Sequence, residues 1–163
     1  KREMVASRGA VPVSYDTENV RERAIAISAG GVTAAFDHIG GKHFKNVSMP
    51  ALRPTGVGIL YGGYDATRGG KVNPLAIADI FLNSRFSGFR LFGRSQGVVG
   101  YSVPAWRDQR PALYRQDLET VLSLVGSGEL SPLIGATFPL KDAAEAQRAL
   151  ESRAFAGKIV LVP

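Results

Sequence analysis

The sequence predicts an α/β protein with a mostly parallel sheet. Short apolar runs that are typical of buried strands alternate along the chain with segments of helical periodicity. Two of these runs, residues 32–37 and 57–61, begin about 25 residues apart, and each leads into a segment that contains glycine. Because open parallel sheets bind nucleotides just beyond the carboxyl ends of their strands, these glycine-ended strands indicate a nucleotide cleft.

The first half of the chain alternates helices and strands. A helical piece over residues 1–8 precedes a short strand over 11–15. Asp16 is expected to cap the next helix, whose apolar residues recur at i, i+4 and i+7 from Val20. The two glycine-ended strands follow, with a helix over residues 44–52 and a turn over residues 53–56 between them.

The second half continues the same alternation. The predicted elements are a loop over 65–73, a helix over 75–86, a strand over 98–103 that Pro104 stops, a helix over 108–125, a strand over 134–138, a helix capped by Asp142 and a strand over 159–162. No linker divides the chain, so residues 1–163 are predicted to belong to one domain.

Composition narrows the function classes. The chain is 45% hydrophobic and 21% charged, which is typical of a globular protein, and no apolar run is long enough for a membrane helix. The formal charge of +6 comes from scattered lysines and arginines, so nucleic acid is not the expected partner. Since cysteine is absent, a thiolate zinc site and a cysteine nucleophile are excluded within the chain, and a cytoplasmic location is expected.

Three motifs were tested for a more specific function, and none of them indicates one. Residues 93–97 match G-x-S-x-G, but a strand follows them instead of preceding them, so a hydrolase elbow is not favoured. The dinucleotide fingerprint G-x-G-x-x-G is absent. Asp37, His38 and His43 lack regular ligand spacing, and a capping aspartate with solvated imidazoles is the preferred interpretation, so no metal site is predicted.

Four segments together resemble one family. They are RGAVPVSY (8–15), AFDHIGG (35–41), LRPTG (52–56) and ESRAFAGKIVL (151–161). In this order and spacing they resemble the nucleotide-binding half of medium-chain dehydrogenases/reductases, in the zinc-independent quinone oxidoreductase branch. The resemblance covers residues 1–163 and implies a Rossmann-like, doubly wound sheet that lacks its first strands. It also implies that the glycine fingerprint and the N-terminal catalytic domain lie outside this chain.

The resemblance implies a set of cofactor-binding residues. Lys1 and Tyr15 match residues beside the 2′-phosphate of the coenzyme, where a cation and a phenol hydroxyl suit a phosphate dianion and favour NADPH over NADH. The remaining matches are Ile39 near the adenosine, Tyr61, Gly62, Gly63 and Tyr64 near the nicotinamide ribose, Tyr101, Ser102 and Val103 near the nicotinamide, and Arg153 at the cofactor. Each of these also suits a core or turn position.

The function implied is hydride transfer from NADPH to a small-molecule electron acceptor, a quinone or an α,β-unsaturated carbonyl. Neither a catalytic residue nor a metal ligand is assigned within the chain. The alternative is a non-catalytic nucleotide-binding or dimerisation module. The strand over 98–103 is largely apolar and uncharged, so an uncovered edge there would be prone to pairing, and the resemblance implies a homodimer through this strand.

Overall fold

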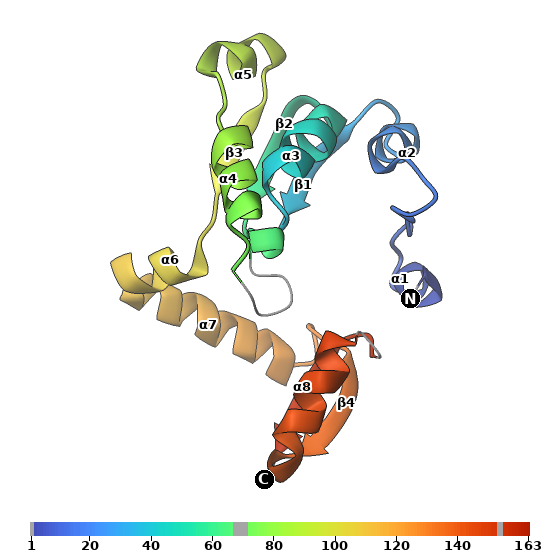
Figure 1. The fold of residues 1–163 in the computed structure, drawn as a ribbon, viewed down its shortest axis with the longest axis vertical. Helices are drawn as coiled ribbons and strands as arrows, with labels where there is room; N and C mark the ends of the chain where they lie inside the picture. The colour runs from blue at the N-terminus through green and yellow to red at the C-terminus, as the bar shows by residue number, and fades with distance from the viewer. Residues whose placement is uncertain (1, 67–71, 153–154) are drawn as a thin grey trace. The chain divides into compact units, whose positions relative to one another are not determined.

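The computed structural model describes residues 2–66, 72–152 and 155–163, and it confirms the α/β class (Figure 1). The chain divides into two compact units, Arg2–Trp106 and Arg107–Pro163. Five strands among the described residues form two sheets, and every strand pairing in them is parallel. None of the described helices combines the length and the apolar character needed to cross a bilayer.

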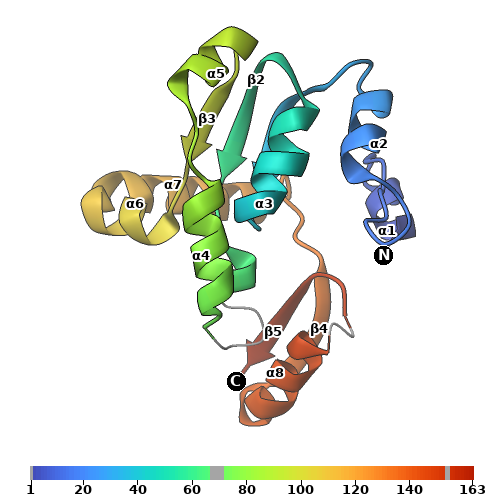
Figure 2. The ribbon, with the colours of Figure 1, turned by 45° about the horizontal axis from the view of Figure 1, so that its top comes forward.

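The first unit is built on a three-stranded sheet of order β1-β2-β3. Its strands are β1 (Val32–Asp37), β2 (Leu52–Leu60) and β3 (Gly97–Gly100). Figure 2 shows β2 and β3 as neighbouring arrows that point the same way. Since all three strands are parallel, their carboxyl ends share one edge of the sheet, as the two glycine-ended strands predict.

The predicted turn over residues 53–56 lies inside β2 as an irregularity of the strand. Val32 pairs with Leu52 and Ala34 pairs with Val57, so two steps along β1 oppose five steps along β2. Thr55 adopts a positive φ of 67°, and its N–H donates to the carbonyl of Ser95 at 2.6 Å. The predicted turn therefore forms a bulge within β2, and the strand continues on both sides of it.

The segment before the sheet differs from the sequence prediction. After α1 (Arg2–Ser7), residues 11–15 form no strand; a turn begins at Ser14, whose carbonyl accepts the N–H of Glu18 at 2.8 Å. The cap of α2 (Val20–Ile27) is Asn19, whose Oδ1 accepts the N–H of Glu22, so the prediction for Asp16 is wrong. The cap lies three residues later than Asp16 because the turn that begins at Ser14 occupies those residues.

The predicted helix after β1 is present, with a mixed geometry. It begins as α3 (Gly41–His43), continues as the π-helical η1 (Phe44–Ser48) and ends as the 3-10 turn η2 (Met49–Ala51). Phe44, Met49 and Leu52 form the buried core beneath the sheet. A Cβ atom at Gly58 of β2 would lie 2.8 Å from the Phe44 ring and 2.7 Å from the Met49 sulfur, so this core requires glycine there.

Two short helices separate β2 from β3. The first, α4 (Pro74–Asn83), is capped by Asn73 and corresponds to the predicted helix over residues 75–86, which ends three residues early. The second, α5 (Gly88–Arg94), is a helix that the sequence did not predict. The predicted strand over 98–103 ends early, at Gly100, and Val103 is the first residue of α6 (Val103–Gln109). Pro104 therefore lies in the first turn of a helix, where its missing N–H costs no hydrogen bond.

The second unit pairs two strands around a helix. It contains α7 (Pro111–Gly126), β4 (Ile134–Pro139), the 3-10 turn η5 (Leu140–Asp142), α8 (Ala143–Glu151) and β5 (Lys158–Val162). The predicted helix over 108–125 is instead divided between α6 and α7, with Arg110 at the N-cap of α7. Asp142 holds the predicted cap position of α8, but its side chain makes no capping hydrogen bond.

Candidate functional site

The carboxyl ends of β1, β2 and β3 bring three chain segments to one edge of the sheet. The N–H of Tyr61 donates to the carbonyl of Asp37 at 2.9 Å, which joins the end of β2 to the end of β1. The N–H of Tyr101 donates to the carbonyl of Leu60 at 2.9 Å, which joins the end of β3 to the end of β2. We call this edge, with residues 38–40, 61–64 and 101–103, the strand-end site.

Three aromatic rings gather at the strand-end site. The ring centroid of His38 lies 6.1 Å from that of Tyr61 and 5.6 Å from that of Tyr64, both in tilted arrangements. The N–H of Tyr64 donates to the carbonyl of His38 at 2.8 Å, so a backbone hydrogen bond holds the segment of Tyr64 beside that of His38. Such partly exposed rings offer flat surfaces against which a planar ligand can stack.

Glycine allows the close packing of these segments. A Cβ atom at Gly62 would lie 2.9 Å from the carbonyl oxygen of His38, closer than real Cβ contacts allow. Gly40 has a positive φ of 81°, a conformation that other residues rarely adopt. The two glycines therefore let the segments after β1 and β2 pass close to each other.

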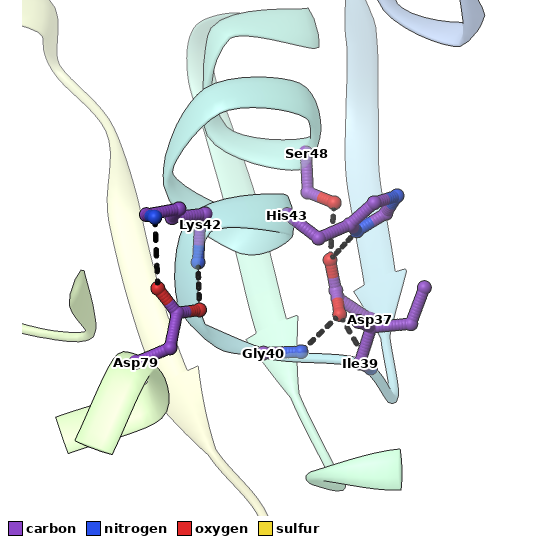
Figure 3. A network of polar contacts seen from close by, with 7 residues as sticks. All are labelled: Asp37, Ile39, Gly40, Lys42, His43, Ser48 and Asp79. Atoms are coloured by element: carbon purple, nitrogen blue, oxygen red, sulfur yellow. Dashed lines mark hydrogen bonds and ion pairs between the residues drawn. The ribbon is translucent and has the colours of Figure 1, made fainter. Parts of the chain in front are cut away.

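Asp37 anchors the loop that carries His38 and Ile39 (Figure 3). Its side chain is buried, and each carboxylate oxygen accepts two hydrogen bonds. Oδ1 accepts the N–H groups of Ile39 at 2.8 Å and Gly40 at 2.9 Å. Oδ2 bonds to the Ser48 hydroxyl at 2.5 Å and to Nδ1 of His43 at 2.7 Å. Asp37 thus binds the loop before α3, whose N-cap is Gly40 with no side-chain capping bond, and the prediction of a merely solvated imidazole is wrong for His43.

The hydrogen bonds keep the buried Asp37 carboxylate ionised. Burial by itself raises the pKa of Asp37, but the bonds from Ser48, Gly40, His43 and Ile39 outweigh it and hold the pKa below its ordinary value of 3.8. Because an ionised carboxylate can only accept, Nδ1 of His43 carries the proton in this bond. The network is therefore a buried anion surrounded by donors, which fixes the start of the helical segment Gly41–Ala51 to the end of β1.

A second carboxylate holds the other side of that helical segment. Asp79 of α4 accepts the backbone N–H of Lys42 at 2.9 Å and Nδ2 of Asn83 at 2.8 Å, and its Oδ1 lies 3.9 Å from Nζ of Lys42. A polar cavity of about 490 Å³ lies beside these groups. Its lining comprises Ile39, Gly40, Lys42, His43, Asn73, Ala76, Asp79 and Ile80. The strand-end site is thus flanked by a groove between α3 and α4.

Comparison with known proteins places this geometry in a family. The family model for zinc-binding dehydrogenases matches residues 9–161. The chain belongs to the zinc-binding dehydrogenase family. This membership confirms the resemblance to a dehydrogenase that was drawn from the sequence.

Individual relatives are distant. The synaptic vesicle membrane protein VAT-1 homologue of Rattus norvegicus is 26% identical over 165 residues, which cover 100% of this chain and 40% of the relative. A mycobacterial protein complexed with NADPH has a TM-score of 0.67 at 22% identity, covering 99% of this chain and 45% of the other. A mycobacterial quinone oxidoreductase has a TM-score of 0.69 at 22% identity, with the same coverages. The chain thus spans less than half the length of these relatives, and the structural matches establish the Rossmann-like fold.

The family name implies zinc, and the described residues of this dehydrogenase chain do not fit a zinc site. Among residues 2–66, 72–152 and 155–163, no group of three or more His, Cys, Asp or Glu side chains is placed to hold a metal ion. The one histidine paired with a buried acid, His43, directs Nδ1 to Asp37 and shares that acid with Ser48. We therefore derive no chemical step through zinc.

The structure gathers part of the predicted cofactor set of this dehydrogenase domain. Ile39, Tyr61, Gly62, Gly63 and Tyr64 lie together after β1 and β2, and Tyr101 and Ser102 follow β3. Val103 belongs to α6, although it directly follows them.

One predicted residue, Tyr15, lies apart from that group, and two more are not described. Tyr15 is 75% exposed in the turn before α2, instead of at a strand end, and no hydrogen bond or ring contact links it to the strand-end site within the described residues. Lys1 and Arg153 lie outside the described residues.

Sequence reasoning missed two features of the site. It considered His38 as a metal ligand and preferred a solvated imidazole, and it did not anticipate the contact of His38 with Tyr61 and Tyr64. It also missed Ser48 as a partner of Asp37. The signal available was spacing, since Asp37 ends a strand and His43 and Ser48 follow 6 and 11 residues later in one helical segment.

Proposed function

We propose that this chain binds the coenzyme in an NADPH-dependent oxidoreductase that transfers hydride to a small-molecule electron acceptor, a quinone or an α,β-unsaturated carbonyl. The observation that carries the proposal is the strand-end site, where glycines and backbone groups after β1 and β2 meet at the carboxyl edge of a parallel sheet. That edge is where open α/β sheets bind nucleotides. Membership of the dehydrogenase family supports the same assignment.

The chain's residues have positioning roles in this proposal. Tyr61, Gly62, Gly63 and Tyr64 border the ribose next to the nicotinamide, Ile39 borders the adenosine, and Tyr101, Ser102 and Val103 border the nicotinamide itself. The bound coenzyme supplies the hydride, and the protein orients it and excludes water. Asp37 acts through the loop 38–40, which its carboxylate holds by two backbone N–H groups.

The preference for NADPH rests on Lys1 and Tyr15, whose cation and phenol hydroxyl suit the 2′-phosphate of the coenzyme. Titration of the intact protein with NADPH and NADH, followed by nicotinamide fluorescence, tests both parts of the proposal. We expect NADPH to bind at least about tenfold more tightly than NADH, because charge-assisted bonds to the 2′-phosphate form only with NADPH. Tighter binding of NADH would remove the roles given to Lys1 and Tyr15, and binding of neither would remove the coenzyme function.

A second candidate is a dimerisation module without catalysis of its own, and the position of β3 favours it. In the order β1-β2-β3, β3 lies at an edge of the described sheet, and Val99 in it is 49% exposed. An uncharged edge strand offers unpaired backbone groups to a second copy of the same strand. We propose a homodimer through this strand under either function. Turnover with NADPH and a panel of quinones and enones by the intact protein separates the two functions.

A further inference from the structure

A second cavity lies on the first unit, away from the strand-end site. It has a volume of about 220 Å³ and is formed by the end of the helical segment Gly41–Ala51, the α4–α5 connection and α5. Its floor is apolar, with Met49, Phe86 and Leu91 among its lining residues, and Phe86 and Leu91 pack against the buried core. The apolar side of the cavity is therefore continuous with the hydrophobic core of the first unit.

The rest of the lining is strongly basic. Lys45, Arg85, Arg90 and Arg94 all line the cavity, and no acidic residue does. Nζ of Lys45 donates to Oδ1 of Asn83 at 3.1 Å, and the Arg85 guanidinium lies 4.8 Å from the centroid of the Phe81 ring. Across residues 2–66, 72–152 and 155–163, none of these four cations lies within ion-pair distance of a carboxylate.

This arrangement of cations favours the binding of an anion. Arg90 and Arg94 stand four residues apart on α5, where like charges on one helix face repel each other. A bound anion would reverse that cost, because guanidinium groups bind phosphate oxygens through paired, charge-assisted hydrogen bonds. The apolar floor adds a preference for a ligand that carries a hydrocarbon group beside its charge.

The cavity is separate from the expected coenzyme edge. Pro50 and Gln96, which also line it, precede β2 and β3, so the cavity lies at the amino ends of these strands. Figure 2 shows α5 at the end of the sheet where the arrows of β2 and β3 begin. Since the strands are parallel, the strand-end site lies at the opposite edge, and the coenzyme proposed there does not neutralise these cations.

We propose that this cavity is a binding site for a phosphate monoester that carries an apolar group. The arginines bind the phosphate, and Met49, Phe86 and Leu91 bury the first carbons of the substituent. A soluble metabolite and a phosphomonoester lipid headgroup share this chemistry. The inference is independent of the coenzyme function, because it uses a different edge of the sheet and none of the same residues.

Calorimetric titration of the intact protein with hexyl phosphate, inorganic phosphate and hexanol tests the site. We expect hexyl phosphate to bind about tenfold or more tightly than inorganic phosphate, because its chain buries apolar surface, and hexanol to show no binding. The double variant R90Q/R94Q is expected to weaken hexyl phosphate binding by about tenfold or more. The matched control is R21Q/R115Q, which removes the same charge from two exposed arginines that do not line the cavity.

Two outcomes would overturn the proposal. One is the absence of hexyl phosphate binding to a protein whose circular dichroism spectrum shows it to be folded. The other is an equal loss of binding in R90Q/R94Q and in the control, which would mean that only overall charge matters.

Vesicles distinguish the two sources of the phosphate. Phe89 and Phe92 on α5 are 84% and 81% exposed, so they are available to enter the interface of a bilayer. If the natural source is a lipid, binding to phosphatidylcholine vesicles requires phosphatidic acid in them and is lost in both R90Q/R94Q and F89S/F92S. If the source is a soluble metabolite, such vesicles do not bind, and F89S/F92S retains its affinity for hexyl phosphate.

Discussion

Nδ1 of His43 lies 2.7 Å from Oδ2 of Asp37. His43 is thus a donor to a buried carboxylate. This contact joins the last residue of β1 to the last residue of α3. With the two backbone donors on Oδ1, it fixes the loop of residues 38–40 from both sides. The conformation of the strand-end site therefore depends on one ionised side chain beneath it.

Removing that side chain should destabilise the first unit. D37A leaves the N–H groups of Ile39 and Gly40 and the side chains of Ser48 and His43 without their acceptor. We expect the free energy of unfolding to fall by about 3 kcal/mol, since bonds to a charged acceptor are strong and buried donors are costly to leave unpaired. S48A removes one donor and should cost about 1 kcal/mol. Urea denaturation measures both, and equal effects of the two variants would contradict the central role of Asp37.

The same carboxylate predicts an acid dependence of stability. The pKa of Asp37 is lowered in the folded protein from its ordinary value of 3.8, so the unfolded chain binds the proton more readily. Its contribution is fully present above the unfolded pKa and is lost as pH falls from about 3.8 through the lower folded pKa. Urea denaturation from about pH 6 to about pH 3 should show this loss in the wild type. D37A should show a shallower decline, and parallel curves would contradict the prediction.

Packing at β2 predicts an intolerance of one methyl group. A Cβ atom at Gly58 would overlap the Phe44 ring and the Met49 sulfur, whereas one at Gly100 of β3 would meet nothing within 4 Å. We expect G58A to lower the free energy of unfolding by about 2 kcal/mol through overpacking, and G100A to be close to neutral. Thermal denaturation of the two variants measures the difference. A neutral G58A would mean that the core beneath the sheet is looser than described.

The approach of two backbones predicts a separate effect on coenzyme binding. In G62A the new Cβ would lie 2.9 Å from the carbonyl of His38 and force the segments after β1 and β2 apart. Under the proposed function, we expect NADPH affinity to fall by about tenfold, because a small displacement at a binding site is costly. G93A, whose Cβ would meet nothing within 4 Å, is the control. Unchanged NADPH affinity in G62A would place the coenzyme elsewhere.

The edge position of β3 predicts how the proposed dimer can be broken. A lysine at Val99 would put a charge on the edge strand that is proposed to pair with the same strand of a second copy. Charged residues on natural edge strands prevent such pairing. Light scattering should report a dimer for the wild type and a monomer for V99K. V11K, at an exposed valine outside the sheet, should remain dimeric. A wild-type monomer would remove the dimer proposal.

Much of the fold could be predicted because it depends on short-range patterns. The apolar run at residues 32–37 and the glycine after 57–61 mark β1 and β2, and both are present in parallel pairing. Predictions failed where a local signal competed with a tertiary one. Pro104 suggests the stop of a strand, but here it opens a helix. The turn residues 53–56 suggest a reversal, but pairing with β1 on both sides keeps them within β2.

The sequence by itself determined the α/β class, the parallel pairing of the glycine-ended strands, the family, and the segments that meet at the carboxyl edge. These follow from periodicity, turn chemistry and motif order, which neighbouring residues carry. Only the tertiary structure decided that Asp37 is a buried anion bonded to Ser48 and His43, and that Lys45 and three arginines line one cavity. Both depend on distances between side chains that are up to 49 residues apart, which periodicity along the chain does not encode.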